Sequence, residues 1–198
     1  DRVSRGLGDV YKRQLLNDNK ILIGSNIFYD HQFDLNHKRT GAGLEAISSI
    51  FDLRGNYYNA LSGSKTTSDG SERALDGWDT QLDYHLPGEK DVNIFANLFE
   101  FENPDSASTY EEKGTKFGAN ASLGNFTIEG GYLDDNQNND AFFGSIKFVV
   151  KLGENGDKKK QNFLEYTDVS DKLYQPVKRE NKIRVVKISK SGVKVGGF

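Results

Sequence analysis

Between residues 20 and 152 the sequence alternates apolar and polar side chains in segments of about ten residues. This period of two predicts β-strands, because successive side chains of a strand point to opposite faces. Turn-forming residues separate the segments, and all three prolines fall outside them. We expect eight strands, at 20–30, 39–47, 52–61, 75–85, 92–101, 115–123, 126–133 and 141–152.

The connections between these segments alternate in length. The longer ones are 31–38, 62–74, 102–114 and 134–140, and the shorter ones are 48–51, 86–91 and 124–125. Outer-membrane barrels have long loops outside and short turns on the periplasmic side. No run of eighteen apolar residues occurs, so we expect no transmembrane helix. The pattern predicts an all-β protein: a transmembrane, antiparallel, up-and-down β-barrel over residues 15–153.

Each segment separates into an apolar set and a polar set. In the last one, Phe142, Ile146 and Phe148 share one face, and Lys147 and Lys151 share the other. A Lys or Arg on the lipid face at the bilayer midplane would cost about 2–4 kcal/mol, so we expect the charged set to face the lumen. The lumen-facing candidates are Glu45, Arg54, Asp79, Asp83, Lys116, Glu129 and Lys147.

Composition and charge refine this picture. The apolar fraction of 35% is low for a water-soluble globule, and the 13 Phe and 9 Tyr suit strands. Residues 1–152 carry 15 Lys and Arg against 23 Asp and Glu, whereas residues 153–198 carry 11 against 6. The basic charges of the second part are dispersed, which does not favour nucleic-acid binding. The absence of Cys is compatible with an oxidising periplasm.

Residues 1–14 (DRVSRGLGDVYKRQ) differ from the rest. They begin with Asp and lack the apolar core of a signal peptide. The stretch resembles translated adapter sequence of the kind left at the ends of metagenomic reading frames. We interpret it as a non-native leader, leave it out of the expected strands and expect the native sequence to start near Leu15.

Residues 41–46 (GAGLEA) match the G-x-G-x-x-A pattern of dinucleotide-binding sites. That chemistry needs a buried strand before the glycines and a helix after them, whose N-terminus holds the pyrophosphate. Here a polar loop precedes the motif and another strand follows it. We therefore interpret these glycines as part of the lumen face of a strand.

Two further features could bind metal. His31, His37 and His85 lack metal-ligand spacing and Cys partners, so we expect them to be loop and rim residues. Residues 134–140 (DDNQNND) could offer oxygen ligands to calcium, but lack the glycine and the terminal glutamate of an EF-hand loop. A solvated hairpin loop is the better interpretation. We find no candidate catalytic, cofactor-binding or metal-binding residues, and no nucleophile has an adjacent base.

Several of these segments together resemble a known family. Residues 20–46 (KILIGSNIFYDHQFDLNHKRTGAGLEA) resemble the barrel of the inverse autotransporters intimin and invasin. The similarity continues through 53–62 (LRGNYYNALS) and 77–87 (GWDTQLDYHLP) to the final-strand pattern at 143–153. It extends more loosely over 172–187.

The resemblance implies a fold and a function. The family's barrel has twelve strands with both ends periplasmic, so this sequence would supply the last eight, and its first strand would be an unpaired edge. Inverse autotransporters are not enzymes: the barrel inserts in the bacterial outer membrane and passes a C-terminal adhesin passenger to the cell surface. Implied partners are outer-membrane lipid, the barrel-assembly machinery, periplasmic chaperones and the chain's own passenger. Residues 154–198 would be a mostly irregular linker in the pore, with a short helix around 162–173.

Two other functions stay open at this point. A porin-type diffusion channel would also have a polar lumen, but would end near its last strand, whereas about 45 residues follow the last strand here. A soluble ligand-binding barrel would need apolar residues inside and charges outside. The apolar outer stripe argues against that alternative.

Overall fold

The computed structural model describes residues 4–88, 91–137, 140–148, 165–189 and 192–195. Two antiparallel sheets contain its strands. In the larger sheet, each strand pairs with its neighbours in the sequence order β1-β2-β3-β4-β7-β8-β9-β10-β11. These strands are β1 (Ser4–Leu16), β2 (Ile21–Gln32), β3 (His37–Ser48), β4 (Phe51–Ala60), β7 (Asp76–His85), β8 (Asp91–Glu102), β9 (Glu111–Leu123), β10 (Phe126–Asp135) and β11 (Ala141–Phe148).

The eight predicted segments correspond to β2, β3, β4 and β7 to β11, which confirms an all-β, antiparallel fold. The predicted loop 31–38 is shorter than expected, because β2 extends to Gln32 and β3 begins at His37. The last part of the predicted segment 141–152 lies outside the described residues.

Residues 1–14 were left out of the expected strands, but most of them lie in a strand. Ser4–Leu16 form β1, which pairs with β2 from Ser4↔Gln32 to Leu16↔Ile21. The larger sheet therefore has nine strands instead of eight. That these residues are a non-native leader stays a prediction.

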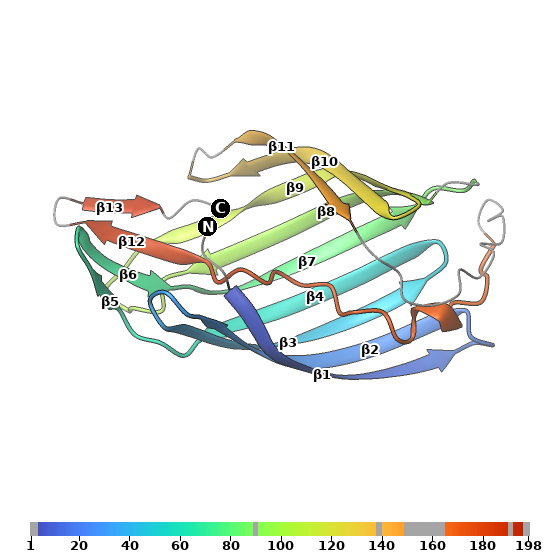
Figure 1. Cartoon of the computed structure of the whole chain (residues 1–198), viewed down its shortest axis with the longest axis horizontal. Coiled ribbons are helices and arrows are strands. Elements are labelled where there is room, and N and C mark those ends of the chain that lie inside the picture. The colour runs from blue at the N-terminus through green and yellow to red at the C-terminus, as the bar shows by residue number, and fades with distance from the viewer. Residues whose placement is uncertain (1–3, 89–90, 138–139, 149–164, 190–191, 196–198) are drawn as a thin grey trace.

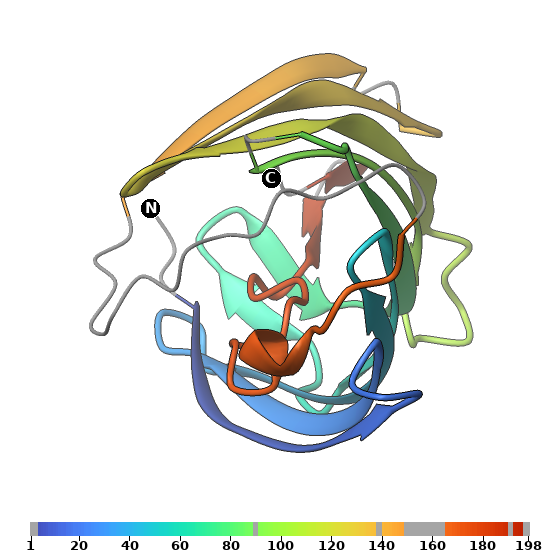
Figure 2. The same ribbon diagram turned by 90° about the vertical axis from the view of Figure 1, so that its right-hand side faces the viewer.

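The larger sheet curls around the C-terminal part of the chain (Figures 1 and 2). Among the described residues β1 and β11 are its edges and form no ladder with each other. The sheet is thus open, and the closed barrel expected from the sequence stays a prediction. We call the end with the β2–β3, β4–β7, β8–β9 and β10–β11 connections the loop end, and the opposite end the turn end.

Two regions expected to be irregular contain strands. The predicted loop 62–74 holds β5 (Lys65–Thr67) and β6 (Gly70–Ala74), and the linker after the larger sheet holds β12 (Val185–Ser189) and β13 (Gly192–Val195). They form the smaller sheet in the order β13-β12-β6-β5. The expected linker helix is reduced, among the described residues, to the 3₁₀ turn η1 (Ser170–Lys172). The local sequence of these segments predicted irregular structure, but pairing with strands from distant parts of the chain makes them strands, and local sequence does not reveal such partners.

The two faces of the larger sheet differ in chemistry. Large apolar side chains are exposed on its outer face, at every second position of most strands. We call them the outer belt: Ile23, Ile27, Leu44, Leu53, Tyr57, Trp78, Leu82, Ile94, Leu98, Phe117, Ile128, Phe142, Ile146 and Phe148. An exposed apolar surface of this extent indicates a membrane or a partner.

The buried apolar residues lie on the inner face in two main clusters. At the loop end, Phe28, Tyr58, Leu75, Phe99, Phe101, Leu133 and Val186 form what we call the aromatic cluster. At the turn end, Leu22 and Ile47 pack with Val169. Val186 and Val169 come from the segment after the larger sheet, so that segment contributes to the core at both ends.

Candidate functional site

Residues 165–189, which we call the tail, cross the inside of the curled sheet from the turn end to the loop end (Figures 1 and 2). At the turn end, the Thr167 amide donates to the Ser49 hydroxyl at 2.9 Å. At the loop end, the Leu75 amide donates to the Arg184 carbonyl at 3.0 Å. The inner face and the tail together form the candidate functional site.

We call the strands of the larger sheet the wall. Near the loop end, an acidic residue of the wall forms an ion pair with a basic residue of the tail. Arg179 lies 2.8 Å from a carboxylate oxygen of Asp30, which also pairs with Arg39 of β3 at 2.6 Å. The Arg39 guanidinium donates to the carbonyls of Glu180 at 2.7 Å and Lys182 at 3.1 Å. One wall arginine thus binds the tail backbone, and one wall aspartate balances two guanidinium groups.

Aromatic rings of the inner face contact two guanidinium groups of the tail. Arg179 stacks over Phe28 at 4.1 Å, and Arg184 lies 4.4 Å and 4.5 Å from the ring centroids of Phe99 and Phe101. Arg184 also forms an ion pair with Glu112 of β9. Cation–π contacts of this kind strengthen when they are desolvated.

At the turn end, Lys172 is the corresponding anchor. Its ammonium donates to the Ser48 carbonyl at 2.8 Å and lies 3.3 Å from Asp52. Asp52 also contacts Arg54 at 2.7 Å and His85 at 3.1 Å. Basic groups of the tail therefore meet carboxylates of the wall at both ends of the inner face.

Strand β1 contributes one arginine to this arrangement. Arg13 pairs with Glu45 at 2.5 Å. It also donates to the carbonyls of Lys172 and Leu173 at 3.1 Å and of Gln175 at 2.5 Å. Side chains of the wall thus satisfy tail carbonyls that have no strand partner, as buried backbone groups require.

The sequence-predicted lumen candidates occupy different surroundings. Four of the seven are buried on the inner face: Glu45, Arg54, Asp79 and Asp83. Arg54 bridges Asp52 and Asp83, and Asp79 accepts from the hydroxyl of Tyr58. Lys116 lies 5.7 Å from the Phe99 ring centroid. Glu129 is half-buried on β10 and Lys147 is exposed on β11. A lumen-facing role for the set stays a prediction.

Sequence reasoning missed the residues that bind the tail: Asp30, Arg39, Asp52, Tyr58 and Glu112 on the wall, and Lys172, Arg179 and Arg184 on the tail. Except for Glu112, these residues of the larger sheet lie inside the predicted segments, near their ends and in phase with the inner set, so applying the alternation over the whole of each segment would have found them. The tail residues had no local signal, since their partners are distant in the sequence.

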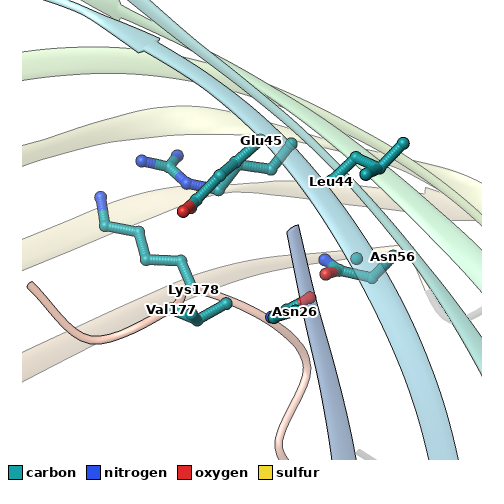
Figure 3. A pocket seen from close by; sticks show the side chains of 8 residues that line it. Asn26, Leu44, Glu45, Asn56, Val177 and Lys178 are labelled. Carbon is teal, nitrogen blue, oxygen red and sulfur yellow. The ribbon is translucent and has the colours of Figure 1, made fainter. Parts of the chain in front are cut away.

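A small, shallow pocket lies between the larger sheet and the tail (Figure 3). Its lining residues are Asn26, Gly43, Leu44, Glu45, Arg54, Asn56, Val177 and Lys178. Gly43 leaves room here for the amide oxygens of Asn26 and Asn56, which a Cβ would displace. Both polar atoms of the Asn26 amide are buried without a hydrogen-bond partner among the described residues. Five of the lining residues have polar side chains: Asn26, Glu45, Arg54, Asn56 and Lys178.

The structure also places the glycine motif and the histidines considered in the sequence analysis. Residues 41–46 lie within β3, which pairs with β4 after a tight connection, so no helix follows the glycines. His31 lies within β2, and His37 is the buried first residue of β3, which corrects the expectation that they lie in a loop. In the described part of the chain, no group of three or more His, Cys, Asp or Glu could hold a metal ion.

At the loop end, the pKa of the Tyr110 hydroxyl is raised because the side chain is half-buried and the carboxylates of Glu112 and Asp135 lie near it.

No helix in the described residues is long and apolar enough to cross a membrane.

Fold and site define an all-β antiparallel protein whose larger sheet holds its own C-terminal segment against a charged inner face. The sequence model of the inverse autotransporter β-domain matches residues 3–181. The chain therefore belongs to the inverse autotransporter β-domain family, which confirms the resemblance seen in the sequence. That family consists of translocator domains of type V secretion in the bacterial outer membrane.

A solved structure from a study of the mechanism of in-meso crystallization of membrane proteins is similar to this fold, with a TM-score of 0.77 and 20% sequence identity. The similarity covers 98% of this chain and 81% of that chain. At this identity the likeness concerns the fold alone. No curated protein matches the sequence.

Proposed function

We propose that this chain is an outer-membrane translocator domain that anchors a C-terminal passenger and exports it to the cell surface. The larger sheet forms the lipid-facing wall. Residues 15–153 are the membrane domain, to which β1 adds an edge strand, and residues 154–198 are the linker that follows the pore. The observation that carries the proposal is the path of the tail, which runs through the inner face from the turn end to the loop end.

The chemistry of the outer face supports membrane insertion. The outward charges of β8 and β9 gather toward the loop end: Glu102 and Glu111 lie at the ends of their strands, and Glu100 and Lys113 lie level with Trp78 at the edge of the outer belt. A charge within the belt would cost about 2–4 kcal/mol at the bilayer midplane and about 0–1 kcal/mol near an interface. The distribution therefore suits a sheet whose loop end stands in water.

The chemistry of the inner face supports the linker's position. The basic tail meets acidic wall residues, and Arg179 and Lys172 pair with Asp30 and Asp52 near opposite ends of the path. Many separate contacts of moderate strength suit a chain that must first move along the inner face and is then held there. Partners for the two sheet edges, β1 and β11, are needed for closure into a barrel, and a ring of more than nine strands would supply them.

The alternative functions fit less well. A diffusion channel keeps its interior open, whereas the tail occupies the interior here. A soluble ligand-binding barrel needs an apolar interior, whereas Arg39, Asp30, Arg54 and Asp83 are buried inside.

The test is protease shaving of intact bacteria that express the chain behind an export signal, with an epitope tag after Phe198. We expect the tag to be cleaved at the surface. A matched control carries the tag in the Gly124–Asn125 turn, which should stay protected because that turn lies at the opposite end. A protected C-terminal tag, together with raised uptake of small solutes, would contradict the proposal and favour a porin.

Membrane insertion is tested separately by the single Trp78, which belongs to the outer belt. Its fluorescence should be quenched by brominated lipids in reconstituted vesicles. Quenching by a water-soluble quencher alone would contradict a lipid-facing wall.

A further inference from the structure

The smaller sheet joins a wall insertion to the tail. Strand β6 pairs with β5 from Lys65↔Glu72 to Thr67↔Gly70, and on its other side with β12 from Ala74↔Val185 to Gly70↔Ser189. The β5–β6 hairpin is inserted between two strands of the wall, and β12 belongs to the tail. Without β12, an edge of β6 would be unpaired, and such an edge is a template for strand addition.

Buried polar contacts fix the hairpin on the wall. His37 at the start of β3 contacts the hydroxyl of Ser62 at 3.1 Å through Nδ1. Its Nε2 lies 3.4 Å from a carboxylate oxygen of Glu72 in β6. The side chains of His37 and Glu72 are both fully buried. The wall itself therefore positions the hairpin at the loop end.

The tail strand fits this position on both of its faces. Val186 is fully buried in the aromatic cluster. Its neighbour Val185 packs on the other side with Ala74 of β6 and Ile183. Backbone pairing and the two side-chain contacts thus select an apolar, extended segment.

Gly70 at the start of β6 is adapted to the tail. Its φ is +154°, a conformation that favours glycine. A Cβ at this position would overlap the Ile188 carbonyl oxygen and lie 2.9 Å from the Ser189 Cα. Both of these atoms belong to β12, so docking of the tail adds a second reason, besides the backbone conformation, for the missing side chain.

We infer that the β5–β6 hairpin is a docking edge that captures residues 185–189 of the exported chain as a β-strand when they reach the loop end. Because the pairing exists only at that end, it holds the chain against sliding back. Main-chain hydrogen bonds give this edge its affinity, and the sites for Val185 and Val186 give it selectivity. The inference rests on the proposed export function.

Docking can be measured by cross-linking, since the chain has no Cys. Ser71 and Ile188 are paired residues of β6 and β12, so the Ser71→Cys, Ile188→Cys double variant should form a disulfide in intact cells. In that background, Gly70→Ala should lower the disulfide yield about tenfold, the scale of a strained backbone combined with a steric overlap. Gly63→Ala is the matched control, because nothing lies within 4 Å of its added Cβ.

Capture is measured by pulse-chase labelling with protease shaving of a C-terminal tag. Gly70→Ala should slow the appearance of the tag at the surface several-fold, whereas Gly63→Ala should leave the rate unchanged. Ile188→Pro is a second variant that leaves the wall intact: β12 lies between β13 and β6, so a proline there removes a ladder hydrogen bond. It should slow export as Gly70→Ala does.

The outcomes separate the two proposals. Export at the unchanged rate in Gly70→Ala and Ile188→Pro would overturn capture, even if the disulfide were lost. An unchanged disulfide yield in Gly70→Ala would overturn the docking geometry. A tag that never reaches the surface in the unaltered chain, while the disulfide still forms, would overturn export and leave docking in place.

Discussion

On β2 to β11, the outer belt carries large apolar side chains that are 39–88% exposed, whereas the inner face carries charged side chains such as Asp30, Arg39 and Arg54 that are almost wholly buried. A water-soluble protein has the reverse arrangement. Lipid removes the cost of the exposed apolar face, and pairing removes most of the cost of the buried charges. The contrast shows that the two faces are adapted to different surroundings and should respond to different substitutions.

The largest effect is expected from unpairing the inner face. Asp30→Ala leaves the guanidinium groups of Arg39 and Arg179 without their shared carboxylate, which should cost about 3–5 kcal/mol of the free energy of unfolding. Urea unfolding in lipid vesicles, followed by Trp78 fluorescence, measures it. Asp34→Ala is the control, because Asp34 is exposed in the β2–β3 connection. Equal stability of the two variants would show that the inner pairing contributes little.

A charge on the outer belt should have the next largest effect. Leu98→Arg places a guanidinium among lipid tails and should destabilise the inserted protein by about 2–4 kcal/mol. Glu102→Arg, on the same face of β8 but at the loop end, should cost about 0–1 kcal/mol. Both are measured by the fraction that folds into vesicles. A similar loss in both variants would contradict a membrane boundary between these positions.

Strand β1 tests the contrast from the opposite direction. Lys12 is exposed on the outer face opposite Ser25, and the paired positions of the next two strands, Leu44 and Gly55, carry no charge. Lys12→Leu should raise the free energy of unfolding by roughly 1–2 kcal/mol, below the midplane value because a lysine on an edge strand can reach the interface. No change would place Lys12 outside the lipid. A foreign origin of residues 1–14 would account for this misplaced charge.

The smallest effect is expected where neither face is involved. Arg73 and Asp105 form a partly exposed ion pair of 3.3 Å at the loop end. Arg73→Ala should cost about 0.2–1 kcal/mol in the same unfolding assay, and added salt should reduce the difference. A loss of unfolding free energy comparable to that of Asp30→Ala would mean that the exposure of an ion pair does not determine how much it stabilises this protein.

The sequence predicted the strands better than the site. Alternation placed Arg54, Asp79 and Asp83 on one face correctly, because the period of a strand is fixed by backbone geometry. It could not predict that Arg184 would stack on Phe99 and Phe101, since those residues are more than eighty positions apart. It also missed β6 and β12, whose pairing partners lie in different parts of the chain.

By itself, the sequence determined the antiparallel strands, their turns, the face on which each side chain lies and membership of the inverse autotransporter family. The strands, turns and faces follow from local periodicity and turn chemistry, which act within a few residues. Family membership rested instead on a resemblance over long stretches of sequence, which the match to the family's sequence model confirms. Only the tertiary structure decided the path of the tail, the ion pairs that hold it and the docking of β12 on β6. Those depend on the curl of the sheet, which brings β2, β4 and β9 around one segment, and local sequence does not encode contacts over such separations.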